Sequence, residues 1–151
     1  THLFADGKGV EHLGAKAPGS MFNPLRIDNK IIADRHHLPY QNGREVFKNA
    51  VTRMPEAVNI ALEHNNLSID DISLVIAHQA NKRILETCAK RMNLPMRKMF
   101  VNIQKYGNTT AATIPIAICE ALKENKFSKG DHIILTAFGA GYTWASAAIK
   151  W

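Results

Sequence analysis

The sequence predicts an α/β fold built on a mixed sheet. Three observations support this class: short apolar runs of strand length, helical periodicity between those runs, and a Gly-rich turn between the last two of them. The predicted order is strand–helix–strand–helix–strand–strand, and alternation of this kind packs helices against a layered sheet. A length of 151 residues suits one domain, or one half of a pseudo-symmetric pair.

Residues 1–40 are rich in turn-forming residues, among them Gly14 and Pro18, and predict the end of a strand followed by a long loop. The first residues resemble the middle of a strand. They lack an initiator Met and the charged and apolar regions of a signal peptide. We therefore expect a fragment, a processed product or one chain of a pair.

A long helix is expected between Asn42-Gly43 and Asn65-Asn66. Apolar residues recur there at helical spacing and define one buried face: Val46, Phe47, Ala50, Val51, Met54, Ala57, Val58, Ala61 and Leu62. Pro55 falls inside this stretch. Because proline has no N–H to donate, we expect it to kink the helix or to begin its second segment.

The middle of the chain predicts a strand, a helix and another strand. Residues 68–71 should form a turn or a short helical start, and the apolar run 72–77 should form a buried strand. Residues 81–92 predict a helix, and residues 99–103 predict a second strand. The residues of that helix expected to face inward are Ile84, Leu85, Cys88 and Met92.

A turn at residues 106–110 leads into a predicted helix that ends near Leu122. This helix is small and apolar almost throughout, so we expect it to be buried. Two strands follow, over residues 132–138 and 143–149, and Gly139-Ala140-Gly141 should join them as a tight hairpin.

Composition argues against several classes of protein. A formal net charge of +6 suits an acidic partner, but no nucleic-acid-binding motif is present. No apolar run reaches the ~18 residues that a membrane span needs. Cys88 and Cys119 lie in predicted helices without metal-ligand spacing, and we expect both to be small core residues in a reducing compartment. The expectation is a cytoplasmic protein with no metal site and no nucleic-acid or membrane partner.

Polar or Gly-rich corners occur at three predicted turns next to strands. They contain His78, Asn108 and the Gly139-Ala140-Gly141 turn. Taken singly, each has an ordinary structural interpretation: a core histidine, a helix cap or turn residue, and a hairpin loop. Because α/β sheets place their sites in loops at the carboxyl ends of strands, the three corners together predict one site.

The same segments resemble the signatures of the β-ketoacyl-acyl-carrier-protein synthase III family. The segments are His78-Gln79-Ala80-Asn81-x-Arg83-Ile84, Tyr106-Gly107-Asn108-Thr109, Ala137 to Trp144, and the flanking runs His2 to Gly7 and Asn42 to Lys48. The spacing of 30 residues between His78 and Asn108 also matches that family.

This resemblance covers nearly the whole chain and implies a thiolase-like fold. Two similar α/β halves would each hold a five-stranded mixed sheet flanked by helices. Residues 1–151 resemble the C-terminal half, with residues 1–40 mostly loop and residues 41–151 forming the α/β core. The N-terminal half, which carries the nucleophilic cysteine of the family, is absent from this chain.

The resemblance implies a Cys-His-Asn condensing site in which His78 and Asn108 are the catalytic members in this half. The cysteine takes an acyl group from acyl-coenzyme A. Malonyl on acyl-carrier protein then loses carbon dioxide, and its carbanion attacks the acyl thioester. A neutral imidazole and a carboxamide can stabilise the enolate by donating two hydrogen bonds.

The backbone N–H of Ala140 matches an oxyanion-hole donor of the family. A third glycine is more usual there, and a positive φ would be costly for alanine. No permanently bound cofactor is implied, because the coenzyme A thioester is a substrate.

Partner positions also follow from the resemblance. Gly43, Phe47, Asn81 and Ile84 match the pantetheine tunnel, although Phe47 could equally be a core residue. Lys48, Arg83, Lys90 and Arg91 match the docking surface for acyl-carrier protein, although a solvated helix face would look the same in sequence. The complete enzyme is expected to be a homodimer.

Two other functions remain open. One is an acyltransferase of secondary metabolism on the same fold, which Asn108 disfavours because that residue suits an enolate. The other is an inactive fragment that only binds acyl-carrier protein. Phe138, Tyr142 and Trp144 lie near the predicted site, and we expect Trp144 and Trp151 to be packing residues.

Overall fold

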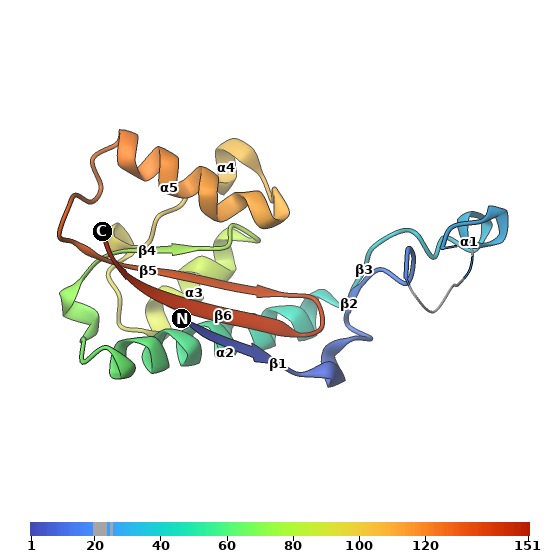
Figure 1. The fold of residues 1–151 in the computed structure, drawn as a ribbon, viewed down its shortest axis with the longest axis horizontal. Helices are drawn as coiled ribbons and strands as arrows, with labels where there is room; N and C mark the ends of the chain where they lie inside the picture. Colours follow the sequence, from blue (N-terminus) through green and yellow to red (C-terminus); the bar gives the residue numbers. More distant parts are fainter. Residues whose placement is uncertain (20–23, 25) are drawn as a thin grey trace.

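The computed structural model describes residues 1–19, 24 and 26–151 of the chain. It contains an α/β body and an arm that extends from one end of that body (Figure 1). The prediction of a long loop over residues 1–40 lies partly outside the described residues, at 20–23 and 25.

The body is built on a four-stranded mixed sheet in the order β1-β6-β5-β4. Strand β4 (Ile72–Ala77) pairs in parallel with β5 (His132–Gly139), and β5 pairs in antiparallel with β6 (Thr143–Lys150). Strand β1 (His2–Ala5) closes the edge in antiparallel register with β6. The predicted mixed sheet is confirmed, but it has four strands where five were expected.

Helices cover both faces of this sheet and make three layers (Figure 1). Helices α2 (Gly43–His64) and α3 (Lys82–Arg91) pack together on one face, and α5 (Thr113–Lys123) lies on the other. Alternate residues of each strand enter the two cores, as Val75 and Leu74 of β4 do.

Helix α2 begins at its N-cap Asn42, whose side-chain oxygen accepts from the Glu45 N–H at 3.3 Å. The helix runs unbroken through Pro55, so the alternative that Pro55 begins a second segment is wrong. Proline leaves the carbonyl four residues earlier without its helical partner. That carbonyl, on Val51, accepts from an Arg91 guanidinium nitrogen at 3.0 Å instead. A side chain from α3 therefore compensates for proline in α2.

Two short 3-10 turns connect the long elements, and only the first was predicted. Residues Ile69–Asp71 form a 3-10 turn, η3, which Ser68 and Asp71 close with a capping box. A second 3-10 turn, η4, spans Met96–Lys98. These turns place β4 and the segment after α3 side by side.

The strand predicted at residues 99–103 is wrong. Only one parallel bridge forms, between Val75 and Met99, and the chain then enters the short helix α4 (Ile103–Tyr106). The cause is the buried side chain of Gln79. Its amide donates to the Phe100 carbonyl at 3.1 Å, and its oxygen accepts from the Asn102 N–H at 3.0 Å. A side chain thus takes hydrogen bonds that a strand ladder would use.

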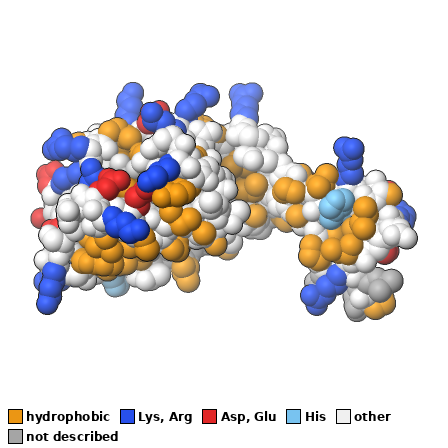
Figure 2. Space-filling view, turned by 90° about the horizontal axis from the view of Figure 1, so that it is seen from above, with side chains coloured by type: hydrophobic (Ala, Val, Ile, Leu, Met, Phe, Trp, Pro, Cys, Tyr) orange, Lys and Arg blue, Asp and Glu red, His pale blue; other side chains and the backbone are white. Residues whose placement is uncertain are grey.

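The expectation that the helix after residue 110 is buried throughout is also wrong. After the 3-10 turn η5 (Thr110–Ala112), α5 buries one side, through Ala117 and Ala121, and leaves Cys119 exposed on the other. Cys119 is therefore not a core residue, whereas Cys88 is buried as expected. Figure 2 looks onto this side of the molecule and shows hydrophobic side chains open to solvent between charged ones.

The arm contains a few short elements. They are η1 (Gly7–Gly9), β2 (Leu13–Gly14), α1 (Asn29–Ala33) and β3 (Tyr40–Gln41), and β2 pairs with β3. Reciprocal backbone hydrogen bonds between Asp6 and Tyr142, at 2.8 and 2.6 Å, fasten the base of the arm to the body. Gly9 lies against the Tyr142 ring so closely that no side chain fits there.

Candidate active site

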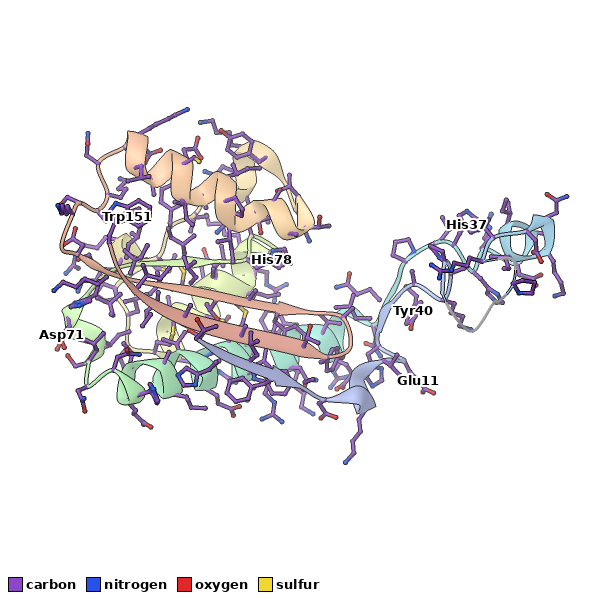
Figure 3. The ribbon with its side chains drawn as sticks, viewed as in Figure 1. Glu11, His37, Tyr40, Asp71, His78 and Trp151 are labelled. Atoms are coloured by element: carbon purple, nitrogen blue, oxygen red, sulfur yellow. The ribbon has the colours of Figure 1, made fainter. Side chains whose placement is uncertain are left out.

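His78 lies directly after β4. Its backbone N–H donates to the Thr136 carbonyl at 2.8 Å, which continues the pairing with β5. Its side chain contacts α5, where Nδ1 lies 2.6 Å from the Thr113 hydroxyl oxygen (Figure 3). Burial lowers the pKa of the His78 imidazole, because a buried site disfavours the charged ring and so favours the neutral one.

Asn108 lies in the loop between α4 and η5. Its side-chain oxygen accepts from the Thr110 N–H at 3.0 Å, so the residue forms a local turn of the kind that asparagine favours. This bond fixes the carboxamide and uses its oxygen. Within the described residues, no protein group accepts from the Asn108 amide nitrogen, which remains available as a donor.

Ala140 lies in the turn that joins β5 to β6, as predicted. The cost expected from a positive φ at Ala140 is not incurred, because the left-handed φ of +134° falls on Gly141. The Ala140 carbonyl accepts from the Thr143 hydroxyl at 3.0 Å. The alanine is therefore compatible with this turn.

The three predicted corners line one pocket of about 810 Å³. His78, Asn108 and Ala140 supply part of its wall, and the rest is mostly apolar. Most of the other lining residues come from β1, α2, α3, α5, β5 and β6 and include Phe4, Met54, Ile84, Ile114, Phe138 and Trp144, and Leu13 of β2 and Gln41 of β3 also line it. A pocket with an apolar wall and few polar groups is the usual form of a small-molecule site.

Of the four residues expected to line a pantetheine tunnel, one lies in the wall of the pocket. Ile84 lines the pocket, whereas Gly43, Phe47 and Asn81 do not. Asn81 caps α3 by accepting from the Arg83 N–H at 2.9 Å. Phe47 is partly buried beneath the Arg83 guanidinium, whose carbon lies 5.8 Å from the ring centre.

The four residues expected to dock a carrier protein lie on α2 and α3. Lys48, Arg83 and Lys90 are exposed. Arg91 is exposed too, but one of its nitrogens is bound to the Val51 carbonyl and to the Thr52 hydroxyl, the latter at 2.8 Å. These two hydrogen bonds hold the Arg91 side chain against α2.

The aromatic residues near the pocket form one cluster. Trp144 stacks on Phe4 with ring centres 5.7 Å apart, and Phe138 lies 4.8 Å from the Tyr142 ring. The Arg53 guanidinium covers Trp144 at 5.2 Å. Trp144 therefore packs as expected, and Trp151 packs edge-on against Phe127 at 4.9 Å.

A polar network surrounds the buried carboxylate of Glu120, and the sequence did not predict it. Glu120 of α5 accepts from the Asn102 amide at 2.8 Å and from the Tyr106 hydroxyl at 3.0 Å, and it pairs with Lys105. These bonds, that of Lys105 first, lower the pKa of the Glu120 carboxyl. The one available signal was an acidic residue within an otherwise apolar helix.

A second pocket, of about 530 Å³, lies in the arm and is lined by Glu11, Arg35 and Tyr40 among others. None of the predicted site residues lines it. In the described part of the chain, no group of three or more His, Cys, Asp or Glu residues could hold a metal ion. No helix in the same part is long and apolar enough to cross a membrane.

Comparison with known proteins identifies relatives along the whole chain. Residues 62–151 match the family described as 3-oxoacyl-[acyl-carrier-protein (ACP)] synthase III C terminal. The chain is 48% identical to β-ketoacyl-[acyl-carrier-protein] synthase III 2 of Bacteroides thetaiotaomicron over 151 residues, which are 99% of this chain and 43% of that protein. It is 44% identical to the synthase III of Roseiflexus castenholzii over 149 residues, or 99% of this chain and 44% of that protein.

Solved structures agree with this relationship. The crystal structure of 3-oxoacyl-[acyl-carrier-protein] synthase III from Aquifex aeolicus matches with a TM-score of 0.84 and 41% identity, over 99% of this chain and 43% of that one. The fold is therefore thiolase-like. The chain spans less than half the length of these relatives.

Proposed function

This chain belongs to the 3-oxoacyl-[acyl-carrier-protein] synthase III family, and we propose that it is the C-terminal catalytic half of a decarboxylating condensing enzyme. The complete enzyme would join an acyl group from acyl-coenzyme A to malonyl-acyl-carrier protein and so start fatty-acid or related polyketide synthesis. The observation that carries this proposal is the shared pocket of His78, Asn108 and Ala140.

The pocket suits the chemistry of decarboxylation. When the malonyl thioester loses carbon dioxide, the electron pair of the broken bond passes to the thioester and charge grows on its oxygen. The neutral imidazole of His78 and the amide of Asn108 can both donate to that oxygen without adding fixed charge. Each preorganised donor of this kind lowers an activation barrier by about 3–4 kcal/mol.

Neither cysteine of this chain suits the nucleophile's role. Cys88 is buried in the α2–α3 core, and burial raises the pKa of its thiol to about 12. Cys119 is exposed on α5, and neither residue lines the pocket. The thiolate is the reactive form of cysteine. A second half must therefore supply the nucleophile.

The open face of the sheet supports an N-terminal half as the partner. Leu3 of β1 is 78% exposed on that face, and the partly exposed residues Ala137 and Ala145 lie beside it along the pocket. The exposed side of α5 borders the same face (Figure 2). An apolar surface of this kind marks a protein interface, and a partner placed there would reach the pocket.

The surface of α2 and α3 supports a docking role for acyl-carrier protein. Lys48, Arg83 and Lys90 are exposed cations, and a patch of positive charge steers an acidic partner better than a single charge does. Asn81, Gly43 and Phe47 lie at the starts of the same two helices. A pantetheine arm could pass between them toward Ile84.

The complete enzyme is further proposed to be a cytoplasmic homodimer that holds no permanent cofactor. The free thiols of Cys88 and Cys119 suit a reducing compartment. The dimer rests on the family resemblance alone.

The proposal is tested by combining the chain with a cysteine-bearing N-terminal half and assaying condensation of acetyl-coenzyme A with malonyl-acyl-carrier protein. His78→Ala and Asn108→Ala should each lower kcat by roughly 10²–10³-fold. The exposed residues His64 and Asn59 of α2 provide matched controls, and their alanine variants should retain activity. Full activity of His78→Ala in a correctly assembled enzyme would contradict the mechanism.

Two other functions give different results in the same system. An acyltransferase of secondary metabolism would transfer the acyl group to an oxygen or nitrogen acceptor, which a panel of acceptors would reveal. A module that only binds acyl-carrier protein would bind it without any N-terminal half, with lower affinity at higher salt.

A further inference from the structure

The contact between His78 and Thr113 joins two elements at the wall of the pocket. The Nδ1 atom of His78 and the Oγ1 atom of Thr113 are 2.6 Å apart, and both residues line the pocket. The Thr113 hydroxyl also lies 3.0 Å from the Thr110 carbonyl oxygen, within the same turn of the helix. One hydroxyl hydrogen therefore has two possible acceptors.

The two choices give different forms of His78. If the hydroxyl donates to the carbonyl, it must accept from a protonated Nδ1, and Nε2 is then a bare acceptor. If the hydroxyl donates to Nδ1, the proton of the neutral ring lies on Nε2. Only the second form can donate a hydrogen bond from the nitrogen that Thr113 does not contact.

The backbone around Thr113 favours the second form. The Thr110 carbonyl already accepts from the backbone N–H of Thr113, which closes the 3-10 turn η5. That carbonyl therefore has a partner without the hydroxyl. The Nδ1 atom, by contrast, has no other hydrogen-bond partner among the described residues. Donation to Nδ1 satisfies both groups, whereas donation to the carbonyl adds a second bond to an oxygen that already has one.

We propose that Thr113 is a positioning residue that holds the proton of His78 on Nε2 by donating its hydroxyl hydrogen to Nδ1. The proposal rests on the proposed function, since it explains how His78 can act as a hydrogen-bond donor to an enolate oxygen. Thr113 itself touches no reacting atom. It acts through the imidazole, whose ring orientation and proton it determines.

The direct test is the tautomer of His78, measured by ¹⁵N NMR of the histidine ring in the chain completed by its N-terminal half. The expected spectrum has a protonated Nε2 and an unprotonated Nδ1. A protonated Nδ1 would overturn the proposal, whatever the enzyme's activity.

The kinetic test compares two variants of Thr113. Thr113→Val keeps the shape and removes the hydroxyl, and it should lower the rate of malonyl decarboxylation by about 10–100-fold, the usual effect of losing a group that orients a functional histidine. The KM for acyl-coenzyme A should stay within about twofold, because the acyl-transfer step uses the cysteine. Thr113→Ser retains the hydroxyl and should restore the rate to within about threefold.

Thr87 of α3 is the matched control. Its hydroxyl also donates to a helix carbonyl, that of Arg83 at 2.7 Å, but it contacts no histidine. Thr87→Val should leave the decarboxylation rate and the His78 spectrum unchanged, and thermal unfolding should show that every variant is folded. If Thr113→Val is folded and as active as the unaltered enzyme, the proposal is wrong.

The two proposals fail separately. Loss of activity in His78→Ala together with an unaffected Thr113→Val would leave the proposed function intact and remove the role of Thr113. Full activity in His78→Ala would remove the proposed function, and the NMR spectrum would still decide whether Thr113 sets the tautomer.

Discussion

The two faces of the sheet differ in how completely they are covered. Under α2 and α3, Val58, Leu85 and Ile134 are fully buried in a continuous core. On the other side, α5 covers β4 and part of β5, and Leu3 at the far edge is 78% exposed. The pocket is lined from both sides, by Met54 and Ile84 of the closed face, which α2 and α3 cover, and by Ile114 of α5.

Buried polar groups are paired on much of the closed face, but not on all of it. On the closed face, the Thr136 hydroxyl donates to the Ala145 carbonyl at 2.9 Å, and the Ser146 hydroxyl donates to the Leu135 carbonyl at 3.1 Å. In the described part of the chain, the buried hydroxyl of Thr109 near the pocket has no protein partner, and neither do the Tyr142 hydroxyl and His2 Nε2 on the closed face. Buried polar groups are normally paired, so each of these atoms is an exception to the usual pattern.

The largest contrast should come from truncating one leucine on each face. Leu85→Ala should lower the free energy of unfolding by about 2–5 kcal/mol, because it leaves a cavity in a closed core. Leu3→Ala should change it by less than about 0.5 kcal/mol in the chain alone, because Leu3 buries little surface there. Urea unfolding followed by circular dichroism measures both, and equal losses would contradict the difference between the faces.

Gln79 joins β4 to the segment that carries Asn108. Removing its side chain should lower the free energy of unfolding somewhat less than Leu85→Ala does. Gln79→Leu removes the bonds to the Ala77 and Phe100 carbonyls, at 2.9 and 3.1 Å, and to the Asn102 N–H. We expect a loss of roughly 2–4 kcal/mol, because buried backbone groups are left unpaired.

The exposed Gln104 is the control for Gln79. Its one bond, to the Val101 carbonyl, is long at 3.5 Å, so Gln104→Leu should have little effect on urea unfolding. A Gln79→Leu variant as stable as Gln104→Leu would show that the hydrogen bonds of Gln79 do not stabilise the fold.

The hydrogen bond between Arg91 and α2 should make a smaller contribution to the free energy of unfolding. Arg91→Met should cost about 1–3 kcal/mol, because the Val51 carbonyl loses its partner. In a Pro55→Ala background the new backbone N–H can take that carbonyl, so the same change should cost less. A double-mutant cycle measures this coupling. Lys90→Met, without a bond of this kind, is the control, and additive effects would refute the link between Arg91 and Pro55.

The last and smallest difference between the two faces should be in the reactivity of the two cysteine thiols. Cys119 should react with a thiol reagent in the folded chain at pH 8, because it is exposed. Cys88 should react only after unfolding, because it is buried and its pKa of about 12 keeps the thiol protonated. Counting labelled thiols with and without denaturant checks this, with Cys119→Ser as the control. Rapid labelling of Cys88 in the folded chain would mean that the closed face opens.

Much of the fold could be predicted because it depends on local patterns. The nine apolar residues assigned to the inner face of α2 are buried or partly buried, and the predicted ends at Asn42 and Asn65 are its caps. The inward residues of α3 are likewise buried. The missing strand at residues 99–103 could not be predicted, because the competing hydrogen bonds come from Gln79, more than 20 residues away.

The residues of the candidate site could likewise be predicted only in part. His78, Asn108 and the Ala140 turn could be named in advance because their types and spacing resemble a family signature, and the structure brings them to one pocket. Thr113 could not be named, because it lies 35 residues from His78 and looks like an ordinary helix residue. Glu120 is conspicuous as an acidic residue in an apolar helix, but its partners could not be predicted, because another segment supplies them.

The sequence by itself determined most of the helices and strands, their order and the chemical groups of the site, since periodicity, turn residues and caps act over a few residues. Only the tertiary structure decided the number of strands, the open side of α5 and the partners of His78 and Arg91. Those outcomes depend on contacts between distant segments. Which groups form hydrogen bonds and which become buried depends on the groups that the folded chain brings together, and local sequence patterns do not predict this.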